Sequence, residues 1–401
     1  MKRKWNMVFI SIFSMLLLSG CWSSKEINDL MIVTGMGIDK VKESGKYQVT
    51  VQVINPAEMA SQSKTERLEV TTYQTTGKTV YEALKRLTVE VPRKLYMSHV
   101  QLIVIGEELA REGILKPLDF ISRNYEFRAD FFILVAKKNK AENVMQILTP
   151  TEPNPSVSLY SSLELSEKEW APSKGIRLDE LITAITVEGK DPILTGVKVS
   201  GDAKKGSNLS GIEQIQPAAV LKLAGIAAFK GDKLVGWLNE KESKGFNYIA
   251  GNVKSTVGTF RCEDGEKAAV EVFNTKTDIK PEMKKGEPHI SVNVDIDANI
   301  GELQCQMDIT KEKSIKQIEK IVSKHVKKLM EASSKRVQQD LQSDVFGFGE
   351  AIRREYPKEW KKLKDNWNER FETLSVDYNV QVEIKRLGTI SNSYEKEMKM
   401  E

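Results

Sequence analysis

The fold is decided first by Met31-Ile32-Val33-Thr34-Gly35-Met36-Gly37-Ile38, an apolar run that predicts a buried strand. After a predicted turn at Glu43–Lys46, apolar and polar residues alternate from Tyr47 to Val53. A period of two is typical of a strand that buries one face. The glycines at 35 and 37 form only a fragment of a dinucleotide-binding pattern, because position 40 is Lys. We therefore expect them to mark close packing of this strand.

Helices and strands alternate irregularly through the rest of the first half. Apolar residues at helical spacing predict helices over 80–87, 109–121, 144–148 and 178–185. Short apolar runs predict strands over 100–105, 131–136 and 193–199. The proline-rich segment Thr149–Pro155 is expected to be an extended connector inside one domain, because a proline disfavours helix at the residue before it.

A β-rich region opens the second half, and a long helix follows it. Ala218–Phe229 and Leu234–Leu238 flank Lys230-Gly231-Asp232-Lys233, which predicts a hairpin. Further strands are predicted over 253–260, 268–273, 290–296, 303–309 and 376–384. From Ile315 to Leu341 apolar residues recur every three to four positions, which predicts an amphipathic helix packed on the sheet.

These patterns predict an α+β fold of mixed sheets flanked by helices, in two or three domains. A doubly wound fold is not expected, because the regular βαβ rhythm is missing. The expected parts are a removed signal peptide (1–20), an N-terminal α+β domain (21–200), a linker (201–217), a β-rich middle domain (218–309), a C-terminal α+β region (310–390), separate or joined to the middle domain, and a flexible tail (391–401).

The first 20 residues have the three parts of a secretory signal peptide. Lys2, Arg3 and Lys4 begin it, Met7–Leu18 is apolar apart from two serines, and Leu18-Ser19-Gly20-Cys21 ends it. These last four residues resemble a bacterial lipobox, in which the cysteine sulfur receives a diacylglyceryl group before the chain is cut. We therefore expect lipid on Cys21, with N-acylation also open, and a body outside the cytoplasm. The alternative is an uncleaved helical anchor, although the apolar run is shorter than the ~20 residues that a spanning helix needs.

The charge balance excludes some partners. The chain has 60 basic and 56 acidic residues, and removal of residues 1–20 would leave 57 basic ones. A body so close to neutral lacks the basic surface that nucleic acid requires, so no nucleic-acid partner is expected. It also lacks a polybasic stretch that could hold an anionic membrane by charge alone.

The sequence predicts neither a catalytic site nor a metal or cofactor site. Gly77-Lys78-Thr79 lacks the first glycine of a phosphate loop, because position 72 is Thr, and predicts a helix start instead. His99, His289 and His325 are far apart and lack partners at metal-ligand spacing, and we expect His99 to be buried or at the rim of the core with one hydrogen bond. A Gly-x-Ser-x-Gly nucleophile motif is absent. We therefore predict that the protein is not an enzyme.

Cys262 and Cys305 both lie in strand-like segments. An exported protein can form disulfides, but nothing in the sequence places the two Cα atoms within bridging distance. We expect two separate buried thiols, with a bridge between them as the alternative.

Four local patterns follow one another along the chain. They are Cys21-Trp22 with Glu26-Ile27 and Gly35–Asp39; Leu95–Gln101 with Ile105–Ala110; Gly225–Phe229 with Leu234–Gly236; and Asp344–Gly349 with Pro357, Trp360, Trp367 and Phe371. In this order, behind a lipobox, they resemble the Ger(x)C family, the C subunit of spore nutrient germinant receptors. Family members often carry a charged pair after Cys-Trp, where this chain has Ser23 and Ser24.

The resemblance implies a role but no reaction. It implies a lipid-anchored α+β protein of the spore inner membrane that acts with integral membrane A and B subunits to trigger germination by nutrients such as amino acids or sugars. Only Cys21 is carried over as a functional site, because the family has no known catalytic residues. The Ser98-His99 and Phe346–Gly349 motifs are expected to be structural, with partner surfaces as the alternative. Binding of the nutrient by this subunit is left open.

Two other roles compete with this one. A substrate-binding lipoprotein of a transporter also begins with a lipobox, but it usually has two βαβ lobes, which the strand order predicted here does not provide. An envelope hydrolase would need a nucleophile or an acid/base pair, and the sequence supplies no such pattern.

Overall fold

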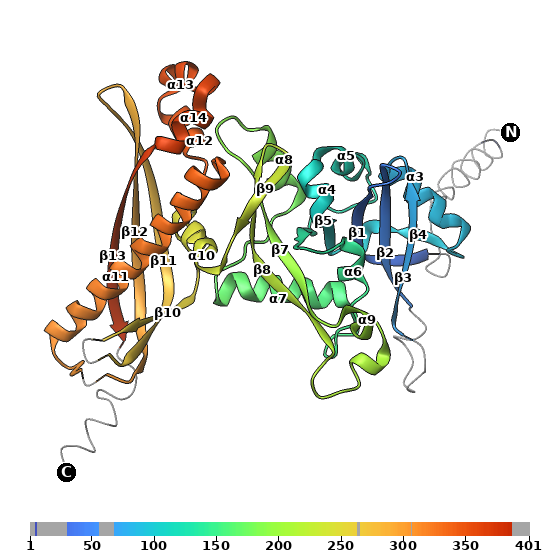
Figure 1. Cartoon of the computed structure of the whole chain (residues 1–401), viewed down its shortest axis with the longest axis horizontal. Coiled ribbons are helices and arrows are strands. Elements are labelled where there is room, and N and C mark those ends of the chain that lie inside the picture. The colour runs from blue at the N-terminus through green and yellow to red at the C-terminus, as the bar shows by residue number, and fades with distance from the viewer. Residues whose placement is uncertain (1–4, 6–29, 56–67, 263–264, 306, 387–401) are drawn as a thin grey trace, which may run out of the picture.

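The computed structural model of the chain describes Trp5 and residues 30–55, 68–262, 265–305 and 307–386. These residues form an elongated molecule with one β-sheet toward each end (Figure 1). The α+β class predicted from the sequence is confirmed. Cys21 and the predicted tail 391–401 lie outside the described residues. Within the described part, no helix has the length and apolar character needed to cross a membrane.

The first sheet has nine strands in the order β3-β2-β1-β5-β6-β7-β8-β9, with β4 beside β1. Strands β1, β5, β6 and β7 are parallel to one another, whereas β2, β3, β8 and β9 run antiparallel to their neighbours. The strands are β1 (Leu30–Val41), β2 (Lys46–Ile54), β3 (Val70–Gly77), β4 (Lys94–Tyr96), β5 (Leu102–Gly106), β6 (Phe132–Ala136), β7 (Ile193–Gly201), β8 (Ala219–Lys230) and β9 (Lys233–Leu238).

Helices cover both faces of this sheet, so its central strands are buried on both sides. Leu102 and Leu134 belong to a cluster with α6 and α7, whereas Ile103 and Ile133 pack in the larger core with α4 and α5. The α-helices of this half are α3 (Val80–Arg86), α4 (Glu107–Glu112), α5 (Leu115–Arg123), α6 (Ala141–Met145), α7 (Pro155–Glu169), α8 (Leu178–Thr186), α9 (Ala203–Gly206) and α10 (Glu240–Ile249), and the 3₁₀ turns are η2 (Leu87–Val89), η3 (Met97–His99) and η4 (Leu209–Gly211).

Two helical regions of the first half differ from the prediction. The single helix predicted over 109–121 is two helices, α4 and α5, because Gly113 between them has a φ of +136°. Helix α7 was missed: it starts at Pro155, the last residue of the proline-rich segment, with Asn154 as its N-cap. The helix start predicted at Gly77-Lys78-Thr79 is confirmed, since Thr79 caps α3.

The second sheet has the order β10-β11-β12-β13. Strands β10, β11 and β12 form an antiparallel meander, and β13 returns parallel to β12. The strand predicted over 303–309 is wrong, because β12 already ends at Leu303. The elements are β10 (Thr256–Arg261), β11 (Lys267–Lys284), β12 (Glu287–Leu303), α11 (Glu312–Lys335), the π-turn η5 (Arg336–Leu341), α12 (Phe348–Glu355), α13 (Pro357–Leu363), the 3₁₀ turn η6 (Lys364–Asn366), α14 (Trp367–Thr373) and β13 (Ser375–Arg386).

Helix α11 lies along the second sheet (Figure 1). Ile318, Val322, Val326 and Met330 form its buried stripe, as the periodicity predicted. Helix α10 crosses α11 so closely that a Cβ on Gly245 would lie 2.0 Å from the carbonyl oxygen of Leu329. The backbones of the two helices are therefore in direct contact at Gly245, which only glycine permits.

The sheets divide the chain at a different place from the sequence analysis. Residues 201–217, predicted as a linker, instead connect β7 to β8, which pair antiparallel within the first sheet. The hairpin predicted at 218–238 is confirmed as β8 and β9, but it extends the first sheet. Residues 310–386 complete the sheet that β10–β12 begin, because β13 pairs with β12. The chain thus changes sheets at α10.

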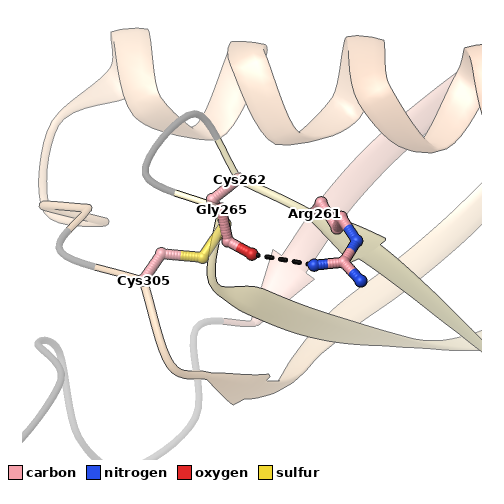
Figure 2. The surroundings of a disulfide bond; sticks show 4 residues. All are labelled: Arg261, Cys262, Gly265 and Cys305. Atoms are coloured by element: carbon pink, nitrogen blue, oxygen red, sulfur yellow. Dashed lines mark hydrogen bonds between the residues drawn. A yellow bond between two sulfur atoms is a disulfide. The ribbon is translucent and has the colours of Figure 1, made fainter.

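Cys262 and Cys305 are joined by a disulfide, so the expectation of two separate thiols is wrong (Figure 2). Their Cα atoms lie 6.2 Å apart. The strand register explains the meeting: Ala268 of β11 pairs with both Phe260 of β10 and Leu303 of β12, so β10 and β12 finish at the same end of the sheet. This register could not be known from the spacing of the two cysteines. Beside the bond, the Arg261 guanidinium donates to the Gly265 carbonyl oxygen at 3.2 Å.

Candidate functional site: the junction between the two sheets

The loop Glu188–Asp191, here called the junction loop, precedes β7 and contacts the second half at each of its four residues. Glu188 accepts a hydrogen bond from the Trp360 indole at 3.0 Å. Lys190 forms an ion pair with Glu350 at 3.8 Å. The contacts of Gly189 and Asp191, which are buried more deeply, are described below. Sequence analysis missed this loop, because a short polar segment between a helix and a strand has no distinctive pattern.

The Asp344 carboxylate accepts more of the hydrogen bonds described at the junction than any other group there. It is buried, and its two oxygens accept four hydrogen bonds: from the amides of Gly347 (2.9 Å), Phe348 (3.0 Å) and Gly349 (2.7 Å) and from the Trp367 indole (3.0 Å). Burial raises the pKa of Asp344 to about 7, although the hydrogen-bond donors oppose this rise. The carboxylate thus fixes the turn that leads into α12 and ties it to α14.

Asp191 links Asp344 to the first sheet. Its carboxylate accepts from the Gly231 amide in the β8–β9 turn at 2.8 Å and from the Asp344 amide at 3.0 Å. Its own amide donates to the Asp344 carbonyl oxygen at 2.9 Å. Burial raises the pKa of Asp191, and the amide donors oppose this rise. Two hydrogen bonds between Asp191 and Asp344, one in each direction, therefore join the two halves at this point.

Two glycines allow the backbones to approach this closely. Gly189 has a φ of +83°, and a Cβ there would lie 2.5 Å from the carbonyl carbon of Gly349. A Cβ on Gly349 would lie 2.8 Å from the Cα of Gly189. The Gly189 carbonyl oxygen also accepts from the Glu350 amide at 2.8 Å. No side chain larger than hydrogen fits at either position without moving the backbone.

An unbroken row of aromatic rings crosses the junction from α10 to α13. Neighbouring ring centroids in the row lie 5.0 to 6.4 Å apart. The rings are those of Phe246, Phe346, Phe348, Phe371, Trp367 and Trp360. Stacked and edge-on aromatic contacts at these distances add to the apolar burial that holds the two sheets together.

The third sequence pattern contacts the residues that directly precede the fourth pattern at this junction. Ser343 donates its hydroxyl to the carbonyl oxygen of Phe229. A Cβ on Gly236 would lie 2.4 Å from Cδ2 of Leu341. Phe346 and Phe348 are buried. This burial supports the prediction that the Phe346–Gly349 motif is structural.

The first and second patterns build a separate part of the first sheet. Asp39 accepts from the amides of Ala141 (2.8 Å) and Glu142 (2.9 Å) and so caps α6. The Ser98 hydroxyl donates to the Glu126 carbonyl oxygen at 2.9 Å. His99 is exposed in η3, farther out than the buried or rim position predicted for it. The close packing predicted for the glycines of β1 is confirmed, because a Cβ on Gly35 would lie 2.0 Å from the Ser156 hydroxyl oxygen.

Within the described ranges, no three His, Cys, Asp or Glu side chains are grouped to hold a metal ion. His289 is buried and its Nε2 lies 2.9 Å from an Asp377 carboxylate oxygen, whereas His325 is exposed on α11. A cavity of about 420 Å³ lies beside the junction loop, with Lys174, Asp179 and Lys190 among its lining residues. The oxygens of the two junction aspartates accept hydrogen bonds from amide and indole donors, so this arrangement serves to join the two halves.

The comparisons with known proteins agree with the two halves of the chain. A family model described as the spore germination protein N-terminal domain matches residues 23–199, and one described as spore germination B3/GerAC like, C-terminal, matches residues 224–388. Spore germination protein KC of Bacillus subtilis (strain 168) is 30% identical over 407 residues, which cover 100% of both chains. The chain belongs to the GerAC-like spore germination family. Another GerAC-like protein, spore germination protein B3 of the same organism, is 25% identical over 95% of this chain and 97% of its own.

A solved structure has a similar fold. The crystal structure of the GerBC protein superposes with a TM-score of 0.56 at 20% sequence identity, covering 87% of this chain and 96% of that one. At this low identity the backbone arrangement is preserved while most side chains differ.

Proposed function

We propose that this GerAC-like chain is a non-enzymatic lipoprotein subunit of a spore germinant receptor. In this role, lipid on Cys21 holds it on the outer face of the spore inner membrane, where it acts with integral membrane A and B subunits to trigger germination in response to nutrients. The observation that carries the proposal is the match, along its whole length, to spore germination protein KC. The sequence Leu18-Ser19-Gly20-Cys21 behind an apolar run supports the anchor.

The disulfide is a second support for export. Disulfides persist in oxidising compartments outside the cytoplasm and are rare inside it. The bond between Cys262 and Cys305 closes a segment with a sequence separation of 43 residues. In the chain-entropy model such a loop stabilises the fold by about 4 kcal/mol. A chain that depends on this bond would reach its full stability after it leaves the cytoplasm.

The junction supports a role in which the two halves act as one rigid unit and each half offers a surface to partners. Because buried hydrogen bonds and ring contacts join the sheets, surfaces on both halves keep a fixed spacing. The lipid would raise the local concentration of this body at the membrane, so that a modest interface suffices to hold membrane partners. The body would then stabilise the signalling-competent state of those partners, which requires different contacts in their two states.

Germination of spores tests the proposal. Spores that lack the gene are complemented with the wild type, with Cys21→Ala or with the control Ser24→Ala, which leaves the thiol in place. We expect the deletion to abolish the response to one nutrient class, the wild type and Ser24→Ala to restore it, and Cys21→Ala to restore it poorly while protein is still made. Membrane fractionation should show Cys21→Ala released from the membrane fraction.

The outcomes separate the competing roles. Normal germination of the deletion strain on every nutrient, with loss of uptake of one solute, would favour a transporter lipoprotein. Turnover of purified peptidoglycan by the wild-type chain would favour an envelope hydrolase. Full function of Cys21→Ala would refute the lipid anchor and leave the receptor role standing.

A further inference from the structure

A second cavity lies between α10, α11, β10 and β11 (Figure 1 shows these elements). Its volume is about 180 Å³. Its walls are apolar, formed by Val270 and Val272 of β11 and by Val322, Val326 and Leu329 of α11. An apolar cavity of about 150 Å³ is large enough to hold benzene, so this pocket has room for an organic group of that size.

Lys244 of α10 lines this apolar pocket although it bears a charge. Only 9% of its surface is exposed, and its ammonium lies 3.3 Å from the centroid of the Trp170 ring. Among the described residues, no carboxylate lies within 4.0 Å of this ammonium. Burial lowers the pKa of Lys244 to about 8, and the charge of Glu240 partly opposes this. Glu240 itself is exposed and accepts a hydrogen bond from the Trp170 indole.

Tyr248 and His325 are two of the other polar residues that line the pocket. Tyr248 is 3% exposed. Burial raises the pKa of Tyr248, so the phenol stays a neutral donor. His325 is exposed at the α11 side, and partial desolvation together with the charges of Lys241, Lys244 and Lys328 lowers its pKa. A buried ammonium without a carboxylate partner, as at Lys244, is rare in native proteins and calls for an explanation.

The balance of charge selects the sign of a ligand. The ammonium groups of Lys241 and Lys244 line the pocket, against the single carboxylate of Glu240. The lowered pKa of His325 favours its neutral ring, so His325 adds little charge. A single carboxylate would supply the ion pair that Lys244 lacks and an acceptor for the Tyr248 hydroxyl. A zwitterion would bring a second ammonium toward these cations. A phosphate would leave the apolar walls without a partner.

We propose that this pocket binds a small organic monocarboxylate whose apolar group has about six carbons, the size that the cavity admits. The carboxylate lies against Lys244 and Tyr248, and the apolar group lies against α11 and β11. Trp170 comes from the first half, and its carbonyl oxygen accepts from the Thr256 hydroxyl at 2.9 Å. An occupied pocket would therefore brace a second contact between the two halves. This inference is independent of the receptor role proposed above.

Calorimetric titration of the full-length chain in lipid nanodiscs tests the site, with empty nanodiscs subtracted. The probes are hexanoate, hexan-1-ol and hexylamine. We expect hexanoate to bind with one-to-one stoichiometry and the neutral and cationic probes to bind about tenfold more weakly or worse, because only the anion pairs with the buried lysine. Lys244→Met should weaken hexanoate by a similar factor. Lys327→Met, which changes an exposed lysine of α11 away from the pocket, should not.

Val326→Trp fills the pocket and should abolish hexanoate binding. Equal binding of hexanoate and hexan-1-ol, or hexanoate binding that Lys244→Met leaves unchanged, would overturn the proposal. Absence of hexanoate binding at millimolar concentration would overturn it too. If either variant fails to fold, the ranking of the three probes on the wild type still decides.

Discussion

The Asp344 carboxylate and the Lys244 ammonium are both buried, but their surroundings differ. Asp344 accepts four hydrogen bonds, from three amides and an indole, whereas Lys244 lies over one aromatic ring without a carboxylate in ion-pair range among the described residues. A buried charge with its hydrogen bonds made fixes a structure, whereas a buried charge without them lowers stability. The difference suggests that the first group serves the fold and that the second is kept for a ligand.

The largest effect on stability should come from removing the Asp344 carboxylate, whose hydrogen bonds are made. Asp344→Ala leaves the amides of Phe348 and Gly349 and the Trp367 indole without an acceptor in a buried site. We expect the free energy of unfolding to fall by about 4 kcal/mol or more. Denaturant unfolding measures this. Asp340→Ala is the matched control, because that carboxylate is exposed in an i,i+4 pair with Arg336 and should cost less than about 1 kcal/mol. A fall of the same small size in both variants would contradict the importance of the junction.

Glycine substitutions test whether the backbones at the junction can move apart to accommodate a side chain. Gly189 and Gly286 have nearly equal φ values, +83° and +84°, but a Cβ would meet the Gly349 backbone at the first position and open space at the second. Gly286→Ala should cost about 1–2 kcal/mol for the backbone conformation alone. Gly189→Ala should cost about 1–3 kcal/mol more, because the two backbones must separate. Equal losses in thermal or denaturant unfolding would show that the halves adjust freely.

The pH dependence of stability should have opposite signs for the two groups. Asp344 titrates near its ordinary value of 3.8 when unfolded and at about 7 when folded, so its contribution to stability is full below pH 4 and is lost as the pH rises toward 7. Lys244 titrates near 10.5 unfolded and about 8 folded, so its contribution rises between pH 8 and 10.5. Each slope is on the order of 1.4 kcal/mol per pH unit.

Unfolding titrations of the wild type and two variants can isolate these slopes. Asp344→Asn should remove the acidic one, and Lys244→Met should remove the alkaline one. A wild-type curve that either variant leaves unchanged would show that the corresponding group keeps its ordinary pKa in the folded chain.

The smallest effect should be a gain in stability, whereas the substitutions at Asp344 and Gly189 lower it. Lys244→Met removes an unpaired buried charge and keeps an unbranched apolar stem. We expect the free energy of unfolding at pH 7 to rise by about 1 kcal/mol, since the relief of desolvation exceeds the lost contact with the Trp170 ring. Lys327→Met, on the exposed face of α11, should change it by less than about 0.5 kcal/mol. A clear loss of stability in Lys244→Met would mean that Lys244 serves the fold, as Asp344 does.

Elements with strong local signals could be predicted from the sequence, and contacts between distant segments could not. The alternation in β2, the hairpin of β8 and β9 and the stripe of α11 depend on residues close in sequence. The disulfide and the junction loop depend on strand register and on sheet order, which local patterns do not encode. Helix α7 had a readable start at Asn154-Pro155, but its weak amphipathic character hid the rest. Gly349 of the fourth pattern could be noticed in the sequence, but the reason for it lies in the Gly189 backbone, which approaches from the other half.

The parallel pairing of β13 with β12 has a consequence for the order in which the chain can fold. The last strand ends at Arg386, so the second sheet stays one strand short until almost the whole chain has emerged. The first sheet is complete once Leu238 has emerged, more than a hundred residues earlier than Asp344. During that interval Asp191 lacks its contact with Asp344, and the apolar face of the β10–β12 meander is not yet covered by α11. Late, long-range pairing of this kind folds slowly and exposes the chain to aggregation. A protein that crosses a membrane N-terminus first would therefore spend its most vulnerable period on the far side, where helper proteins that recognise apolar strands would have most effect on its yield.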